Sequence, residues 1–308
     1  MRRLLLATAL LAALLAAAPT NAYKVGISDQ QSATFGNPLY SGLKLGIARY
    51  IAPYDVMSDP TQEGKLQAWL SAARAHRQRV LIHFEHSRLS GQDRRLPSVA
   101  AYTRALKRFK AKYGSQVEAI GAWNEVNRKP VRVEDHYEGQ PTYNNPKRVA
   151  QYYMAARKVF TGKKIVALDI LDENDVRPAL RYIKKFLKYA KPHPKYWGLH
   201  NYSDTNRGSA KRTKAVLKAT KKGEVWLTET GGIVALGSSF PFNELRAAKA
   251  LGCMFSLAKS NRRVTRLYIY QFYGAPQGAR FDAGLVDYTG GAKRPGWEVV
   301  RTRRASRC

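Results

Sequence analysis

The sequence predicts a single (β/α)₈ barrel, an α/β fold in which eight parallel strands close into a ring inside a layer of helices. Two observations predict it. Short apolar runs rich in β-branched and aromatic residues alternate with longer segments whose apolar residues recur every three or four positions. The short runs number eight, and this alternation implies parallel strands joined by right-handed crossovers. Eight such units favour a closed barrel over an open sheet.

The expected elements follow one another without a linker or a composition shift. The strands are 24–28, 44–51, 79–85, 117–124, 164–170, 196–202, 224–230 and 264–272. The helices are 61–77, 98–113, 146–160, 177–190, 209–220 and 243–259, with a short last helix near 295–303. Asp59-Pro60 and Asn145-Pro146 are typical helix starts. The first connection, 29–43, has too many chain-breaking residues for a long helix. We expect one catalytic domain over 23–308.

The first 22 residues have the features of a secretory signal peptide. Arg2 and Arg3 precede an apolar stretch from Leu4 to Ala18, and "PTNA" ends in the small residues that signal peptidase prefers. The alternative is a retained membrane anchor, but this stretch falls short of the ~20 apolar residues that span a bilayer. We therefore expect a cleaved signal peptide over 1–22 and a secreted, monomeric mature chain.

The chain is strongly basic. It holds 53 Lys and Arg against 22 Asp and Glu, a net charge of +31, and many of the cations fall in "YIKKFLKYAKPHPK" and "SAKRTKAVLKATKKGE". One interpretation is a basic, solvated exterior. The other is electrostatic retention on an anionic cell wall, acidic exopolysaccharide or extracellular nucleic acid. No nucleic-acid-reading motif is present, so binding to nucleic acid would be independent of sequence.

Two cysteines, Cys253 and Cys308, leave two possibilities open. Export permits a disulfide between them. Cys253, however, lies in the helical run "LRAAKALGCMFSLAKS", where a buried free thiol is ordinary.

Many polar residues fall at the ends of the expected strands, where a barrel of this kind carries its active site. A buried carboxylate such as Glu125 is costly unless it is paired or used. Merely structural strand ends would not need so many polar groups. In strand order, the polar residues at the strand ends are Asp29; Arg49; His83, Glu85 and His86; Asn124, Glu125 and Asn127; Asp169 and Asp172; His200 and Tyr202; Glu229; and Gln271 and Tyr273.

These motifs resemble clan A of the retaining glycoside hydrolases, and the resemblance extends over essentially the whole mature chain. Asn124-Glu125 in "AWNEVN" matches the Asn-Glu pair after the clan's fourth strand, and Glu229 in "WLTETGG" matches the second Glu on its seventh. "HNY", with His200 and Tyr202, matches a frequent His-x-Tyr, and Arg49 matches an Arg often found on the second strand.

Two departures leave the family within the clan unassigned. "YQFYGAP" offers Gln271 and Tyr273 where the clan often has a Trp, and Val126 follows Glu125 where a Pro is usual.

The resemblance implies that Glu125 is the acid/base and Glu229 the nucleophile. Retention needs two carboxyl groups roughly 5 Å apart. Arg49 and Tyr202 are expected to hydrogen-bond to Glu229 and to favour its ionised form. Glu125, beside Trp123 and an anionic Glu229, is expected to have a raised pKa and to stay protonated until it acts. The expected role of Asn124 is to donate a hydrogen bond to the sugar 2-hydroxyl.

The remaining candidates have weaker expectations. Substrate binding is expected of Arg49, His200, Tyr202, Asn127, Gln271, Tyr273 and His86. His83 and His86 suit either sugar binding or a structural role, and Asp172 is expected to cap the loop into the fifth helix. No cofactor or metal is expected, because His, Asp and Glu are scattered over different strands. Five aromatic residues suit sugar stacking or plain packing: Tyr137, Tyr143, Trp197, Phe272 and Tyr273.

The expected function is therefore a secreted retaining glycosidase that cleaves O-glycosidic bonds of a polysaccharide or oligosaccharide. The long loop 127–144 suits endo-action, although a pocket-forming loop would look the same. One alternative is a non-catalytic sugar-binding barrel, which would tend to lose one of the two carboxylates. Another is a cell-surface adhesin that binds polyanions through its basic helices.

Overall fold

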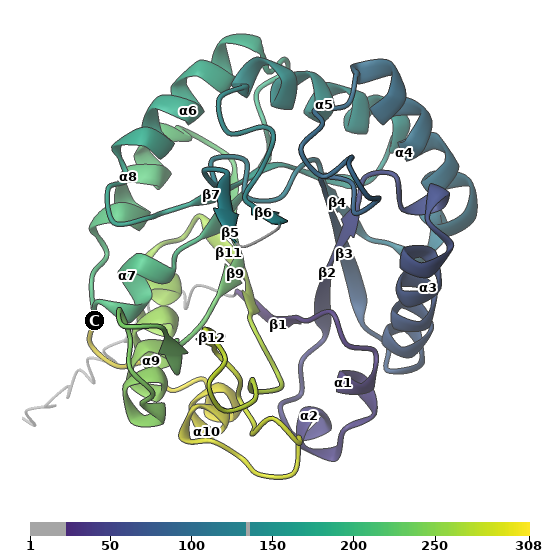
Figure 1. Cartoon of the computed structure of the whole chain (residues 1–308). Helices are drawn as coiled ribbons and strands as arrows, with labels where there is room; N and C mark the ends of the chain where they lie inside the picture. The colour runs from purple at the N-terminus through teal and green to yellow at the C-terminus, as the bar shows by residue number, and fades with distance from the viewer. Residues whose placement is uncertain (1–22, 134–135) are drawn as a thin grey trace, which may run out of the picture.

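The structure is a closed barrel of eight parallel strands, as predicted (Figure 1). It is a computed structural model that describes residues 23–133 and 136–308, so the expected signal peptide lies outside the described residues. Around the ring the strand order is β1-β11-β9-β8-β7-β4-β3-β2. The strands are β1 Lys24–Ser28, β2 Ile47–Pro53, β3 Arg79–Glu85, β4 Ala119–Gly121, β7 Lys164–Leu171, β8 Tyr196–His200, β9 Glu224–Thr230 and β11 Val264–Ile269.

Helices cover the outside of this ring. The longer ones are α3 Pro60–Ala75, α4 Val99–Tyr113, α5 Pro146–Val159, α6 Arg177–Tyr189, α8 Lys211–Ala219, α9 Glu244–Ser260 and α10 Pro295–Thr302. The first connection holds only α1 Ala33–Gly36 and α2 Pro38–Gly42, as its breakers predict. The short pieces are α7 Tyr202–Asn206, η1 Val56–Ser58 and η2 Gly114–Gln116. Asp59 caps α3 by accepting hydrogen bonds from the amides of Thr61 and Gln62.

Two small antiparallel strand pairs lie in the loops at the carboxyl ends of the barrel strands. β5 Val131–Val133 pairs with β6 His136–Glu138 inside the long loop 127–144, and β10 Ala235–Leu236 pairs with β12 Phe281–Asp282. Three expected strands end earlier than the sequence suggested. β4 ends at Gly121, β8 ends at His200 before Tyr202 begins α7, and β11 ends at Ile269, because the chain leaves these strands to form the loops that follow them.

The barrel interior has an apolar layer below a polar one. Side chains alternate along a strand, so residues two apart face the same side. Ile47, Leu81 and Trp226 therefore point into the barrel, and two positions further on Arg49, His83 and Thr228 lie above them. The apolar layer consists of Ile47, Leu81, Ala119, Val166, Trp226 and Tyr268. The polar layer lies toward the carboxyl ends of the strands.

Glycines make room for this polar layer. A Cβ atom at Gly121 would collide with the imidazole of His83, and one at Gly198 would collide with the carboxylate of Asp169. A larger apolar core, which includes Trp69, lies between the strands and the helices. Among the described residues, no helix is both long enough and apolar enough to cross a membrane.

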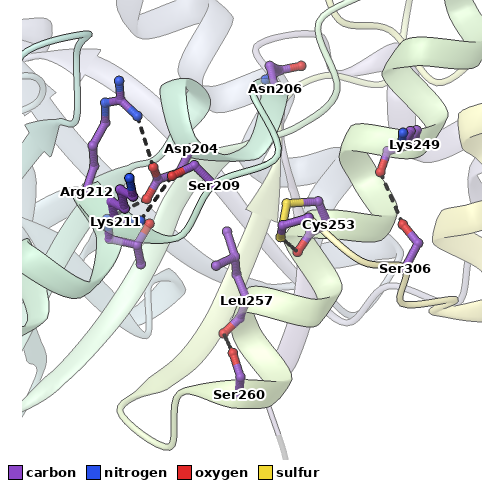
Figure 2. The surroundings of a disulfide bond; sticks show 12 residues. Asp204, Asn206, Ser209, Lys211, Arg212, Lys249, Cys253, Leu257, Ser260 and Ser306 are labelled. Atoms are coloured by element: carbon purple, nitrogen blue, oxygen red, sulfur yellow. Dashed lines mark hydrogen bonds and ion pairs between the residues drawn. A yellow bond between two sulfur atoms is a disulfide. The ribbon is translucent and has the colours of Figure 1, made fainter.

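Cys253 and Cys308 form a disulfide, which decides between the two possibilities left open by the sequence. Figure 2 shows Cys253 on α9 with the C-terminal tail lying across it. The tail is also held by hydrogen bonds from the Ser306 amide to Gly252 O, 3.0 Å, and from the Ser306 hydroxyl to Lys249 O, 3.4 Å. The disulfide thus ties the end of the chain to the helical layer.

Replacing Cys308 with serine should lower the free energy of unfolding by about 2–4 kcal/mol, because the bond closes a long loop in the unfolded chain. Urea unfolding followed by tryptophan fluorescence measures this change. Arg307→Ser, which alters the exposed neighbour, is the control and should unfold like the wild type. Equal stability of Cys308→Ser and the wild type without a reductant would contradict the prediction.

Candidate active site

A cleft opens at the carboxyl ends of the strands, over the polar layer. Its larger hollow, about 470 Å³, is lined by residues that include Glu125, Arg128, Tyr202, Glu229 and Tyr270. An adjoining hollow of about 390 Å³ shares Glu125 and Glu229 and continues over the loops that follow β1 to β4. The two glutamates therefore stand where the hollows meet.

Glu125 and Glu229 face each other across this junction. Glu229 lies on β9, and Glu125 follows β4; one carboxylate oxygen of each lies within 4.8 Å of the other. Glu125 has a φ of +44°, a left-handed conformation that costs a non-glycine residue about 1–2 kcal/mol. The turn is fixed by the Val126 amide, which donates to Asp169 O at 3.0 Å. Strained backbone conformations of this kind are common at functional sites.

Two donors hold the carboxylate of Glu229. Arg49 Nη1 lies 2.9 Å from Oε2, and the Tyr202 hydroxyl donates to Oε1 at 3.2 Å. These are the contacts expected from the sequence. Burial, together with the charge of Glu229, raises the pKa of Tyr202, so its hydroxyl keeps the proton that it donates.

Arg49 is fully buried and is the centre of the polar layer. Burial alone would lower the pKa of Arg49, but Asp169 and Glu229 raise it, so the guanidinium stays charged. Its Nη2 donates to Asp169 at 2.8 Å and to Asn124 at 2.7 Å. Its Nε donates to His83 Nδ1 at 3.0 Å. One guanidinium on β2 therefore connects β3, β7 and β9 with the residues that follow β4.

Asp169 is the buried counter-charge in this network. Its Oδ2 lies 2.8 Å from Arg49, 3.1 Å from His83 and 3.3 Å from His200, and Thr228 donates to its Oδ1 at 2.6 Å. Burial would raise the pKa of Asp169, but His83 and Arg49 hold it well below its usual range. Burial lowers the pKa of His83 to about 4, so that imidazole is neutral.

Glu125 has the opposite pKa shift to the one expected. Burial raises its pKa, but His200 and Arg128 outweigh burial and lower the pKa of Glu125 to about 2. His200 Nδ1 lies 3.2 Å from Oε1, and Arg128 Nη1 donates to Oε2 at 3.1 Å. For His200, burial would lower the pKa, but Glu229, Asp169 and Glu125 raise it to about 9. The expectation overlooked these two cations. At neutral pH these two pKa values place the proton of the pair on His200.

The other predicted site residues are divided between the cleft and its surroundings. Asn124 and His86 line the cleft. Asn127 does not, because its side chain makes two hydrogen bonds to the backbone of Leu171. Gln271 and Tyr273 are not among the lining residues either, and Tyr273 packs edge-on against Phe272.

Several residues in the site were not on the predicted list. Tyr270 lines both hollows, in place of the two residues expected from the eighth strand. Arg128 bridges Glu125 and Glu138, and Arg280 also contacts Glu138, at 3.4 Å. Of these residues only Tyr270 had a sequence signal, because it lies within the expected strand 264–272. The arginines lie on irregular loops, which carry no periodic pattern.

The weaker candidates have structural roles. His83 is enclosed in the polar layer, and Trp197 and Phe272 are buried in the core. Asp172 accepts hydrogen bonds from the amides of Ser203 and Asp204, so it caps α7 rather than the helix after its own strand. Tyr143 lines a separate hollow. The Tyr137 side chain lies outside the part of the structure that is described.

The barrel brings together three residues that sequence spacing had kept apart. Glu125, His200 and Glu229 each offer one atom within 4.8 Å of the others, a spacing that a metal ion could bridge. The expectation that no metal can bind because His, Asp and Glu are scattered over different strands therefore does not follow. The charges favour a proton over a cation, because Arg49 and Arg128 already neutralise the two carboxylates and a pKa of about 9 keeps His200 protonated at neutral pH.

The fold is similar to those of solved glycoside hydrolases. GH5_18 from Streptomyces cattleya, in complex with GlcNAc, matches with a TM-score of 0.66 at 13% identity, over 92% of this chain and 80% of that one. Native xylanase 10B from Thermotoga maritima matches with 0.61 at 13% identity, over 92% and 94%. Xylanase B from Clostridium stercorarium F9 matches with 0.61 at 15% identity, over 91% and 96%.

No family model matches this chain, and no curated protein matches it. At these identities the structural matches show the barrel fold.

Asp169→Asn should lower the pKa of His200 from about 9 toward its ordinary value near 6.5, because the variant removes one of the carboxylates that stabilise the imidazolium. Titration of the histidine ring signals by NMR measures this shift. Asp55→Asn, which replaces another buried aspartate, should leave the pKa of His200 unchanged. An unaltered His200 titration in Asp169→Asn would show that Asp169 does not set the charge of the site.

Proposed function

We propose that this protein is a retaining glycosidase in which Glu229 is the nucleophile and Glu125 the acid/base. The observation that carries the proposal is the spacing of the two carboxylates, within 4.8 Å between their oxygens at the junction of two hollows. Retaining glycosidases hold their carboxyl groups about 5–5.5 Å apart, whereas inverting enzymes need about 6.5–9.5 Å to admit a water. Two of the structural neighbours are xylanases, which supports cleavage of glycosidic bonds as the reaction of this protein.

The environment of Glu229 suits a nucleophile. Arg49 and Tyr202 each donate to one of its oxygens and aim the carboxylate at the cleft. In the first step an oxygen of Glu229 bonds to the anomeric carbon of the sugar, and the bond to the leaving oxygen breaks. The product of this step is a covalent glycosyl-enzyme, and the leaving oxygen needs a proton.

The Glu125–His200 pair supplies that proton. The proton rests on His200 before substrate binds, 3.2 Å from Glu125 Oε1, and Glu125 stands at the cleft surface. Transfer from His200 Nδ1 to Glu125 and on to the leaving oxygen leaves His200 neutral and Glu125 ionised. The carboxylate then removes a proton from the water that attacks the glycosyl-enzyme, and Glu229 is released.

The surroundings of the cleft suit a polymeric substrate. The two hollows continue on either side of the glutamates, and the β5–β6 pair forms a wall that contributes Glu138 to both. This shape favours endo-action on a polysaccharide, with Asn124 contacting the sugar 2-hydroxyl. We also propose that the chain is exported by its first 22 residues, acts as a monomer and is retained at an anionic cell wall by its charge.

Exogenous azide should distinguish the roles of the two glutamates. Glu125→Ala keeps the nucleophile, so a substrate with a good leaving group should form the glycosyl-enzyme and then stall. Azide needs no base and should release a glycosyl azide with the anomeric configuration of the substrate. Glu229→Ala should instead give the opposite anomer, because azide enters the vacated face directly. NMR of the products measures both outcomes.

Swapped anomers would mean that the two roles are reversed. No azide product from either variant, on a substrate that the wild type cleaves, would contradict double displacement. No release of sugar from any polysaccharide by the wild type, in contrast, would favour a sugar-binding barrel or an adhesin.

The pH profile should report the shared proton. Because the pKa of His200 is about 9, kcat/KM for a substrate with a poor leaving group should fall as the pH rises through about 9, where the pair loses its proton. An activated aryl glycoside, whose leaving group needs no proton, is the matched control and should fall much less. Equal alkaline losses on both substrates would contradict His200 as the proton reservoir.

A further inference from the structure

We propose that the substrate is an acidic polysaccharide, and that a basic face made by α6 and α8 holds the strand beside the cleft. This inference rests on the proposed glycosidase function and names its substrate class. Three observations carry it: the charge of this face, a hollow at its edge, and the wall that the hollow shares with the cleft.

The basic face, defined as helices α6 and α8, belongs to a segment, residues 176–223, with an extreme charge imbalance. The segment contains fourteen Lys and Arg, nine of them on the two helices, and a single acidic residue, Asp204. Asp204 is buried, where it accepts hydrogen bonds from the Thr213 amide and from Arg212. All fourteen cations except Arg212 are exposed. The solvent-facing charge of this face is therefore uniformly positive.

Most of these cations have no anionic partner. Within the described residues, Arg177 pairs with Asp175 and Arg212 with Asp204, whereas the lysines of α6 and α8 form no ion pair. α6 and α8 contact each other and lie side by side on the outside of the barrel (Figure 1). Rows of like charge repel one another, and a polyanion lying along both helices would relieve that repulsion.

A hollow of about 160 Å³ lies at the edge of this face and has the groups that an acidic sugar needs. Its lining includes Tyr143, Asn144, Arg181 and Lys185. A tyrosine ring can stack on a sugar, an amide can bind hydroxyls, and the two cations can bind a carboxylate. Asp175 is paired with Arg177 and also attracts Arg181, whereas Lys185 has no ion pair with any described residue.

The hollow and the cleft share one wall. Asn127 lines the hollow, Leu171 lines the cleft, and the two residues are joined by hydrogen bonds of 3.0 and 2.9 Å. Asn127 follows Glu125 by two residues. A polysaccharide that leaves the cleft over this wall therefore enters the hollow and then meets α6.

The cleft itself is also lined by cations. Arg128 and Arg280 line its larger hollow, and both contact the one carboxylate of Glu138. The Arg280 side chain is 68% exposed. Both the cleft, through Arg280, and the hollow, through Lys185, thus offer positive charge.

The surface favours a polysaccharide over a nucleic acid. Single-stranded nucleic acids bind along rows of stacking aromatic residues. The large apolar residues exposed on the described surface include only one in the basic face, Tyr189, and Lys147 lies over its ring. The face offers charge without a stacking track.

Affinity electrophoresis tests binding of the polysaccharide and does not require turnover. A negative result would therefore contradict the proposed substrate class without contradicting the glycosidase activity. The probes are polygalacturonate, its fully methyl-esterified form, polyglycerol phosphate and single-stranded DNA. The wild type should bind polygalacturonate in 50 mM salt and bind it at least tenfold more weakly in 300 mM salt, because exposed charges are screened. Arg181→Gln/Lys185→Gln should weaken binding about tenfold.

The matched control is Arg104→Gln/Lys107→Gln, which also removes one arginine and one lysine charge, but from α4, a helix separated from α6 by α5. It should change the affinity less than twofold, and thermal melts establish that both variants are folded. An equal loss in the control would overturn the proposed location. Equal binding of the esterified polymer, or tighter binding of polyglycerol phosphate or DNA, would overturn an acidic polysaccharide as the ligand.

Discussion

The site depends on one buried charge, the guanidinium of Arg49. A charge without water is tolerated only when opposite charges and hydrogen bonds surround it. Arg49 meets this need with Asp169 and Glu229 as anions and with Asn124 and His83 as acceptors. Because these partners come from different strands, satisfying Arg49 also fixes where each of them stands. The carboxylate that we propose as the nucleophile is thus positioned by the same contacts that make the charge tolerable.

The protonation of the second glutamate, Glu125, is controlled by His200 and Arg128. His200 contacts Asp169 below and Glu125 above, so it couples the buried network to the cleft. Its proton is stabilised by three carboxylates, and Glu125 is kept ionised by that proton and by Arg128. Substrate that excludes water or displaces Arg128 would shift the proton toward Glu125. The acid step in this account therefore depends on a proton that two residues share, and the strained backbone of Glu125 holds its carboxylate within reach of both His200 and the cleft.

The periodic parts of the fold could be predicted from the sequence, and the irregular parts could not. Apolar runs separated by amphipathic segments indicated the barrel, and polar residues at strand ends indicated Arg49, Glu125, Tyr202 and Glu229. The pKa of Glu125 was predicted with the wrong sign, because Arg128 lies on a loop and the role of His200 depends on Asp169, whose contacts arise only when the ring closes. Gln271 and Tyr273 were misplaced because residues past the end of a strand have no periodicity to follow, and Tyr270 lines the cleft instead.

The central claim is that Glu229, held by Arg49 and Tyr202, forms a covalent bond to the sugar. The most direct measurement is mass spectrometry of peptides after inactivation with a 2-deoxy-2-fluoro glycosyl fluoride of a sugar that the wild type cleaves, since this compound forms the glycosyl-enzyme quickly and releases it slowly. The account predicts one added sugar per chain, located on the peptide that carries Glu229. A stable label on Glu125, or inactivation with no covalent adduct, would contradict it.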